Sequence, residues 1–129
     1  MAGSYKDLRV WREAMHLAET LYAATEHFPQ HETYGLRNQM RRAAVSVASN
    51  IAEGKGHRSD LEFGHFLFHA RGSLLELETQ IVLAARLKYL KCDTEEELLK
   101  VTTSVAKSLN ALINALKGEA SSQRLTTKD

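Results

Sequence analysis

Residues 36–56 read LRNQMRRAAVSVASNIAEGKG, and this stretch predicts one amphipathic helix with small residues on its packing side. An α-helix turns about 100° per residue, so side chains three or four positions apart share a face. The apolar members of that face are Leu36, Met40, Ala43, Ala44, Val47 and Ile51. Because alanine is small, a neighbouring helix can approach this face closely. The remaining helices are therefore expected to pack around this one.

A row of polar side chains runs beside the apolar face, and we call it the polar ridge. Its members are again spaced by three or four, and they are Gln39, Arg42, Ser46, Asn50 and Glu53. Polar and charged groups next to a packing face are costly to bury unless they are hydrogen-bonded or paired. We therefore expect the ridge to be buried or half-buried in a polar network, in which Arg42 and Glu53 fix the alignment of neighbouring helices.

Length and composition indicate one soluble domain. The chain has 129 residues, of which 43% are hydrophobic and 26% are charged, and these are ordinary values for a globular protein. The single cysteine, Cys92, excludes a disulfide bond or a cysteine-based zinc site within one chain. No apolar run approaches the roughly 18 residues of a membrane span, and the N-terminus lacks a signal pattern. We expect a cytoplasmic protein that does not bind membranes.

Two further helical patterns flank residues 36–53, where Gly54 and Gly56 are expected to stop the central helix. The first begins near Asp7 and ends at Phe28-Pro29, because proline disfavours the helical conformation in the residue before it. The third begins at Ser59-Asp60-Leu61-Glu62, which fits a capping box. It runs to about Lys88 and is expected to be the longest helix.

A fourth helical pattern completes the bundle. Thr94 and Glu97 have the spacing of a capping box at its start, and Gly118 is expected to end it. Four helices with short connections predict an all-α fold, an antiparallel up-down-up-down four-helix bundle over residues 1–118. Residues 119–129 are polar and aperiodic, and we expect them to form a flexible C-terminal tail.

The third helix carries more apolar surface than one bundle face requires. Its main stripe consists of Phe63, Leu67, Ala70, Leu74, Leu77, Ile81 and Ala84. A second line on its flank is spaced by sevens and consists of Leu61, Phe68, Leu75, Val82 and Tyr89. Together they cover more than half of the helix, whereas a bundle helix needs an arc of about 100° or somewhat more. The first helix likewise has a broad apolar face of two adjacent stripes, Leu8, Trp11, Met15, Ala18, Tyr22 and Val10, Ala14, Leu17, Leu21. Because a monomer rarely exposes such surfaces, we predict a homo-oligomer.

Two Glu-x-x-His pairs raise the possibility of a di-metal bundle. They are Glu13 with His16 and Glu62 with His65. Metal ligands of such a site must project into the bundle, but helical phase places both pairs opposite the apolar stripes. No catalytic triad or glycine-rich phosphate loop is present at a meaningful spacing. We therefore expect no metal site, no cofactor and no catalytic residue, and hence not an enzyme.

Arg71 and Glu78 lie close to the apolar stripe of the third helix, within about 80° of its centre. Charges at such positions are costly unless they are paired. We expect a buried or interfacial ion-pair network in which Arg41 or Arg42 pairs with Glu78. Ser73, at the middle of the same helix, marks a point where a neighbouring helix approaches closely.

Basic residues are unevenly distributed, although the net charge is only +1 from 17 basic and 16 acidic residues. That balance argues against a dedicated nucleic-acid binder, which usually has a strongly basic surface. Arg37, Arg41, Lys55 and Arg58 nevertheless gather in one segment of the chain. If they bind RNA or DNA, the contacts will be mainly to phosphates, because no aromatic residue among these four can stack on bases.

A set of short motifs spread over residues 7–90 is typical of one protein family. The motifs are Asp7-Leu8-x-Val10-Trp11, Phe28-Pro29, Tyr34-Gly35-Leu36, Arg42-Ala43-Ala44-Val45-Ser46-Val47, Asn50-Ile51-Ala52-Glu53-Gly54 and Gly72-Ser73-Leu74-x-Glu76-Leu77-Glu78-Thr79-Gln80. Together they resemble the four-helix-bundle proteins encoded in intervening sequences of bacterial large-subunit ribosomal RNA genes. The resemblance implies a cytosolic homopentamer, and most members of this family have no assigned biochemical activity.

A distantly related group adds a second implication. The accessory proteins of diversity-generating retroelements bind nucleic acid and a reverse transcriptase through a basic pentameric surface. This chain departs from them because its charge of +1 gives only +5 for a pentamer. Our leading interpretation is a non-enzymatic, self-assembling scaffold or interaction protein whose partner is a second copy of itself. The alternative is an RNA- or DNA-binding accessory factor.

Overall fold

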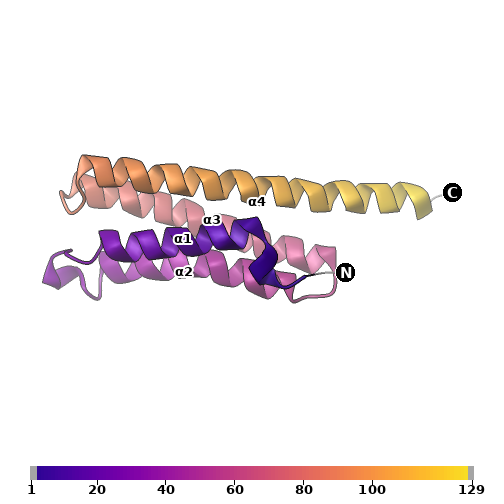
Figure 1. Ribbon diagram of the computed structural model, residues 1–129, viewed down its shortest axis with the longest axis horizontal. Coiled ribbons are helices and arrows are strands. Elements are labelled where there is room, and N and C mark those ends of the chain that lie inside the picture. Colours follow the sequence, from indigo (N-terminus) through magenta and orange to yellow (C-terminus); the bar gives the residue numbers. More distant parts are fainter. Residues whose placement is uncertain (1–2, 128–129) are drawn as a thin grey trace.

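The computed structural model describes residues 3–127, and they form four α-helices and two short 3₁₀ helices (Figure 1). The α-helices are α1 (Arg9–Ala24), α2 (Leu36–Lys55), α3 (Asp60–Arg86) and α4 (Cys92–Thr127). The 3₁₀ helices are η1 (Tyr5–Asp7), before α1, and η2 (Gln30–Glu32), in the link between α1 and α2. No strand occurs within this described range, so the predicted all-α class is confirmed. Side chains are described as far as Gly118.

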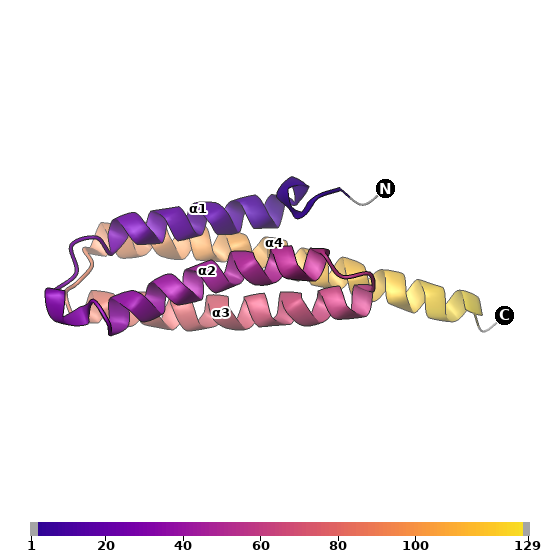
Figure 2. The ribbon, with the colours of Figure 1, turned by 90° about the horizontal axis from the view of Figure 1, so that it is seen from below.

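The four helices pack side by side in a cyclic order. α1 lies against α2 and α4, and α3 lies against the same two helices, whereas in the described part of the chain the backbones of neither diagonal pair approach closely. The α1–α2 and α3–α4 links lie at one end of the molecule, and the α2–α3 link lies at the other (Figures 1 and 2). α4 is the longest helix and projects beyond its neighbours at the end opposite the α3–α4 link (Figure 2).

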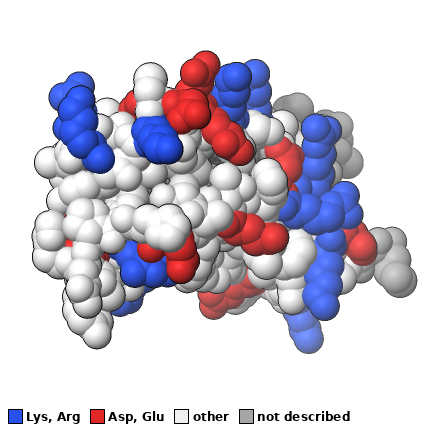
Figure 3. All heavy atoms as spheres, turned by 60° about the vertical axis from the view of Figure 1, so that its left-hand side comes forward, with Lys and Arg blue, Asp and Glu red and all other residues white. Residues whose placement is uncertain are grey.

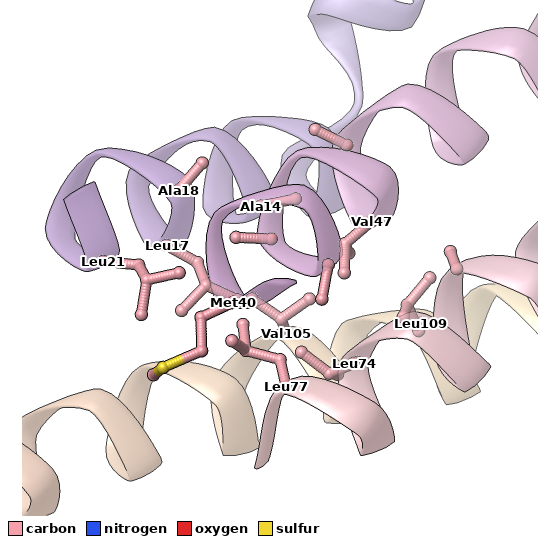
Figure 4. Packing of buried hydrophobic residues seen from close by; sticks show 14 of the residues in the cluster. Ala14, Leu17, Ala18, Leu21, Met40, Val47, Leu74, Leu77, Val105 and Leu109 are labelled. Carbon is pink, nitrogen blue, oxygen red and sulfur yellow. The ribbon is translucent and has the colours of Figure 1, made fainter. Parts of the chain in front are cut away.

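Apolar side chains from all four helices meet along the axis of the bundle (Figure 4). Leu17 of α1, Met40 of α2, Leu77 of α3 and Val105 of α4 are each fully buried there. The predicted apolar face of residues 36–56 is buried except for Leu36, which is half-buried. The main stripe predicted for the third helix is buried throughout. Periodicity thus identified the core-facing sides of both helices.

α2 continues to Lys55 and is capped at Gly56, so Gly56 ends the helix as predicted, whereas Gly54 lies within it. Gly54 is instead buried against α3. A Cβ atom at this position would lie 2.6 Å from Cβ of Phe66 and 3.0 Å from Cδ1 of Phe63. Glycine is therefore required here because the two helices approach too closely for any side chain.

α1 ends at Ala24, earlier than the predicted end at Phe28. Thr25 is fully buried, and its hydroxyl donates to the carbonyl oxygen of Leu21 at 2.9 Å. The same hydroxyl accepts from Nε of Arg41 on α2 at 2.9 Å. A threonine hydroxyl that bonds to a backbone carbonyl oxygen competes with the hydrogen bonds of the helix. Here this bond accompanies the end of α1 and the start of the α1–α2 link.

α3 begins where the sequence predicts, because the hydroxyl of Ser59 accepts from the backbone N–H of Glu62 at 3.1 Å. α4 differs from the prediction at both ends. It begins at Cys92, and its 36 residues exceed the 27 of α3, so the expectation that the third helix is longest was wrong. The helix also passes through Gly118, since a single glycine weakens a helix by about 1 kcal/mol without ending it.

The C-terminal segment 119–129 was predicted to be an aperiodic tail, but most of its backbone is helical. α4 extends helical structure over this segment as far as Thr127. Residues 128 and 129 lie outside the described residues.

Lys88 is the one described residue other than glycine with a left-handed backbone, at φ 68°. It ends α3 in a turn where the backbone N–H of Tyr89 donates to the carbonyl oxygen of Ala84 at 2.9 Å. Glycine is preferred at this position because it lacks the Cβ atom that makes the conformation costly. Lys88→Gly is expected to raise the free energy of unfolding by about 1 kcal/mol.

Chemical denaturation measures this effect, and Lys107→Gly is the matched control. Lys107 is exposed within α4, where glycine is expected to lower the free energy of unfolding by about 1 kcal/mol. Two variants with losses of equal size would contradict the role assigned to the turn at Lys88.

Candidate interaction surface

The polar ridge of α2 is only partly engaged within one chain. The hydroxyls of Ser46 and Ser73 lie 2.9 Å apart and join α2 to α3. Nδ2 of Asn50 donates to the carbonyl oxygen of Ser46 at 2.8 Å and to its hydroxyl at 3.0 Å. These three side chains are half-buried, whereas Gln39, Arg42 and Glu53 are exposed. The small polar members of the ridge therefore hold the α2–α3 contact, and the long ones point toward solvent in the single chain.

The predicted ion-pair network around Arg71 and Glu78 does not form within the described side chains, where neither residue has a salt bridge. Nη1 of Arg71 donates to Oδ1 of Asn110 on α4 at 3.2 Å. Glu78 lines a shallow groove between α3 and α4. The prediction that Arg41 or Arg42 pairs with Glu78 was wrong for the single chain, because Arg41 is engaged elsewhere and Arg42 is exposed.

Arg41 joins α2 to the end of α1. Its Nη2 donates to the carbonyl oxygen of Tyr22 at 3.0 Å and lies 3.6 Å from a carboxylate oxygen of Glu26. Its guanidinium group also stacks over the ring of Tyr22, 4.4 Å from the centroid. This arginine is therefore used for packing between two helices.

The four basic residues proposed to bind nucleic acid do not form one surface. Arg37 and Arg41 lie near the start of α2, whereas Lys55 ends it and Arg58 follows in the next link. Eighteen residues of helix separate Arg37 from Lys55, a rise of about 27 Å. In addition, Arg37 is half-buried. The arrangement therefore gives no single basic patch from these residues.

Charges of both signs are mixed on the face shown in Figure 3. Lysine and arginine side chains alternate there with aspartate and glutamate around a broad uncharged area, and basic side chains gather mainly toward one edge.

Among the described residues, no helix is both long enough and apolar enough to cross a membrane.

Glu13 holds α1 against α4, although helical phase predicted a solvated side chain. Its carboxylate accepts from the hydroxyls of Ser104 at 2.6 Å and Ser108 at 2.7 Å, and Nε of Arg9 lies 3.3 Å away. Burial alone would raise the pKa of Glu13, but the two serine hydrogen bonds and Arg9 together lower it below its usual value. The sequence signal was the spacing of four between the serines, which places both on one face of α4.

A second contact joins the two links at one end of the bundle. Glu32 accepts from the backbone N–H of Leu36 at 3.0 Å, which lowers the pKa of its carboxyl group, and from the hydroxyl of Tyr89 at 3.0 Å. That hydrogen bond to Glu32 raises the pKa of Tyr89. Its ring also packs on Phe28, with centroids 5.4 Å apart. Tyr89 thus connects the α3–α4 link to the α1–α2 link.

The two Glu-x-x-His pairs are not brought together as a metal site. Glu13 is bound to serines, and Glu62 contacts Nδ1 of His57 at 2.6 Å. Within the described residues no group of three or more potential ligands is close enough to hold a metal ion. The glutamates of the two pairs therefore serve in separate contacts, Glu13 between α1 and α4 and Glu62 with His57.

The flank of α3 that faces α4 leaves large apolar side chains uncovered, and we call this surface the α3–α4 face. Leu61 is 74% exposed, Leu75 is 58% exposed and Phe68 is 42% exposed. The ring of Phe68 lies 4.9 Å from the guanidinium carbon of Arg71 and 5.4 Å from Nζ of Lys117 on α4. Of the line with the spacing of seven, Leu61, Phe68 and Leu75 are therefore exposed, whereas Val82 is half-buried and Tyr89 packs on Phe28.

Two comparisons place this fold among known proteins. A crystal structure of a protein of unknown function from the S23 ribosomal protein family of Bacteroides thetaiotaomicron superposes with a TM-score of 0.76. The alignment has 21% identity and covers 81% of this chain and 95% of that one, which shows a shared fold. A search of curated proteins found no match. The family model described as 23S rRNA-intervening sequence protein matches residues 6–111, and the chain therefore belongs to this family, as its motifs predicted.

Proposed function

We propose that this protein is a non-enzymatic scaffold or interaction protein that assembles with copies of itself in the cytoplasm. In this proposal each protomer is an antiparallel up-down-up-down bundle, and the assembly is a pentamer, the number that the family resemblance implies. The observation that carries the proposal is the α3–α4 face, on which Leu61, Phe68 and Leu75 are exposed.

The α3–α4 face has the extent and spacing of a helix-pairing surface. Leu61, Phe68, Leu75 and Val82 follow one another at intervals of seven residues, the interval at which helices of neighbouring chains pair. From Leu61 to Val82 this line rises about 31 Å along α3. Monomeric proteins rarely expose a continuous apolar surface larger than a few hundred Å². The line is long enough to act as one side of a contact between copies.

A non-enzymatic role is supported by the structural contacts that the groups with shifted pKa values make. Glu13 bridges α1 and α4, and Glu32 and Tyr89 bridge the two links. Perturbed groups often mark active sites, but structural networks also perturb pKa values. In this bundle their hydrogen-bond partners are serines, a backbone N–H group and one another, which accounts for the shifts structurally.

Light scattering coupled to gel filtration tests the proposal. The wild-type protein at micromolar concentration is expected to elute as an oligomer, and Leu75→Glu is expected to shift it to a monomer. Tyr34→Glu is the matched control, because Tyr34 is a 92% exposed aromatic residue in the α1–α2 link and lies outside the α3–α4 face. A monomeric wild-type protein would overturn self-assembly. An oligomer unaffected by Leu75→Glu would overturn the use of this face.

A further inference from the structure

A second uncovered apolar surface lies between α1 and α2, and we call it the α1–α2 face. Met15 is 37% exposed, and Tyr22 and Val45 are each 43% exposed. Tyr22 adjoins α2 because the guanidinium group of Arg41 lies over its ring. Val45 follows Arg41 by one helical turn and so projects on the same side of α2. Met15 lies seven positions before Tyr22 and so projects on the same side of α1, which places the three side chains on one surface.

The two apolar faces lie on opposite sides of the bundle. In the cyclic order, the α1–α2 pair and the α3–α4 pair are joined by the α2–α3 and α1–α4 contacts. The Ser46–Ser73 hydrogen bond belongs to the α2–α3 side, and the bonds from Ser104 and Ser108 to Glu13 belong to the α1–α4 side. The chain thus has two apolar faces on opposite sides, and these polar contacts lie on the sides between them.

We infer that the α1–α2 face of one copy binds the α3–α4 face of the next copy, an inference that rests on the proposed self-assembly. A contact between two unlike faces repeats from copy to copy and closes into a ring when the rotation permits. A contact between two identical faces would instead join only two copies and leave the other apolar face of each uncovered. Pairing unlike faces covers both with one kind of contact, whereas pairing identical faces would need two different self-complementary contacts.

The side chains of both faces have the composition of protein interfaces. Each face carries an exposed aromatic ring with an arginine stacked on it, Tyr22 with Arg41 and Phe68 with Arg71. Aromatic residues, methionine and arginine are enriched in the buried centres of protein contacts. These surfaces therefore fit another folded protein surface.

The available area fits a second copy of this chain. A face formed by two helices, each about 10 Å wide, spans roughly 500 Å² over the length of α1, before side-chain relief is counted. Stable contacts bury about 800 Å² of accessible surface on each partner, so a contact must use the whole of this face, including the relief of its side chains. The α3–α4 face of another copy is an extended surface of this kind, and every copy carries one.

Two variants, each blocked on one face, test the inference directly. Met15→Glu/Val45→Glu blocks the α1–α2 face, and Phe68→Glu/Leu75→Glu blocks the α3–α4 face. All four side chains are exposed, and circular dichroism verifies that each variant is folded. If a double variant unfolds, Val45→Glu and Leu75→Glu replace the pair. Each variant alone is expected to be monomeric, whereas an equimolar mixture is expected to give a heterodimer of twice 14.5 kDa.

Each outcome of the mixing experiment has a distinct meaning. A heterodimer that grows no further supports the pairing, because one unblocked face of each kind remains. A variant that dimerises by itself would show contact between identical faces and overturn the inference. A mixture that stays monomeric up to a few hundred micromolar would also overturn it, while an oligomeric wild-type protein would leave self-assembly standing. A monomeric wild-type protein would overturn the proposed function itself.

Discussion

Gly54→Ala is expected to lower the free energy of unfolding by about 1–3 kcal/mol, although alanine favours helix over glycine by about 1 kcal/mol. The added methyl group would lie 2.6 Å from Cβ of Phe66. That atom is fixed to the backbone of α3, so rotation of the phenyl ring does not relieve the clash. α2 and α3 must therefore move apart, which disturbs the apolar contacts along their whole interface.

Gly72→Ala is the matched control for this prediction. Gly72 lies within α3, and a Cβ atom added there meets no other atom within 4 Å. The same substitution is therefore expected to raise the free energy of unfolding by about 0.5–1 kcal/mol, through helix propensity alone. Urea unfolding followed by circular dichroism, at one fixed protein concentration, measures both. Effects of the same sign in both variants would refute the close contact.

Met40→Ala is expected to lower the free energy of unfolding by about 2–5 kcal/mol. Met40 has no exposed surface, and it lies in the core to which all four helices contribute (Figure 4). Removing its side chain loses the transfer free energy of the buried atoms and leaves a cavity that rigid helices fill only in part. The loss therefore affects the packing of the whole bundle and not one contact.

Met40→Leu separates volume from chemistry at the same position. Leucine keeps most of the buried volume, so this variant is expected to lose less than about 1.5 kcal/mol. Thermal or urea unfolding compares the two variants under the conditions used for wild type. If alanine and leucine cost the same, the site would not be a packed core position.

The fold could be predicted from the sequence wherever one helix carries its own signal. The spacing of apolar residues identified the buried sides of α2 and α3, and Ser59 identified the start of α3. Gly54 was misinterpreted because glycine signals both a helix end and a close contact. Which of the two applies depends on Phe66 of another helix, and that information is not local.

The candidate site was harder to predict because it depends on distances between helices. Arg37 and Lys55 belong to one short segment of sequence, but a helix places them about 27 Å apart. Glu13 was assigned to solvent from its phase on α1, yet two serines of α4 bind it. The spacing of Leu61, Phe68 and Leu75 and the broad apolar face of the first helix were visible in the sequence. That Val45 of α2 adjoins the face of α1 needed the structure.

The placement of the links gives the bundle two unlike ends. Tyr89 and Glu32 fasten both links together at one end, whereas η1 and the projecting part of α4 lie at the other (Figure 2). In a cyclic assembly all copies have the same orientation relative to the rotation axis. If the helices run along that axis, the links joined by Tyr89 and Glu32 form one end of the ring. The projecting ends of α4 then form the opposite end. Anything attached beyond α4 would then be displayed in one direction only.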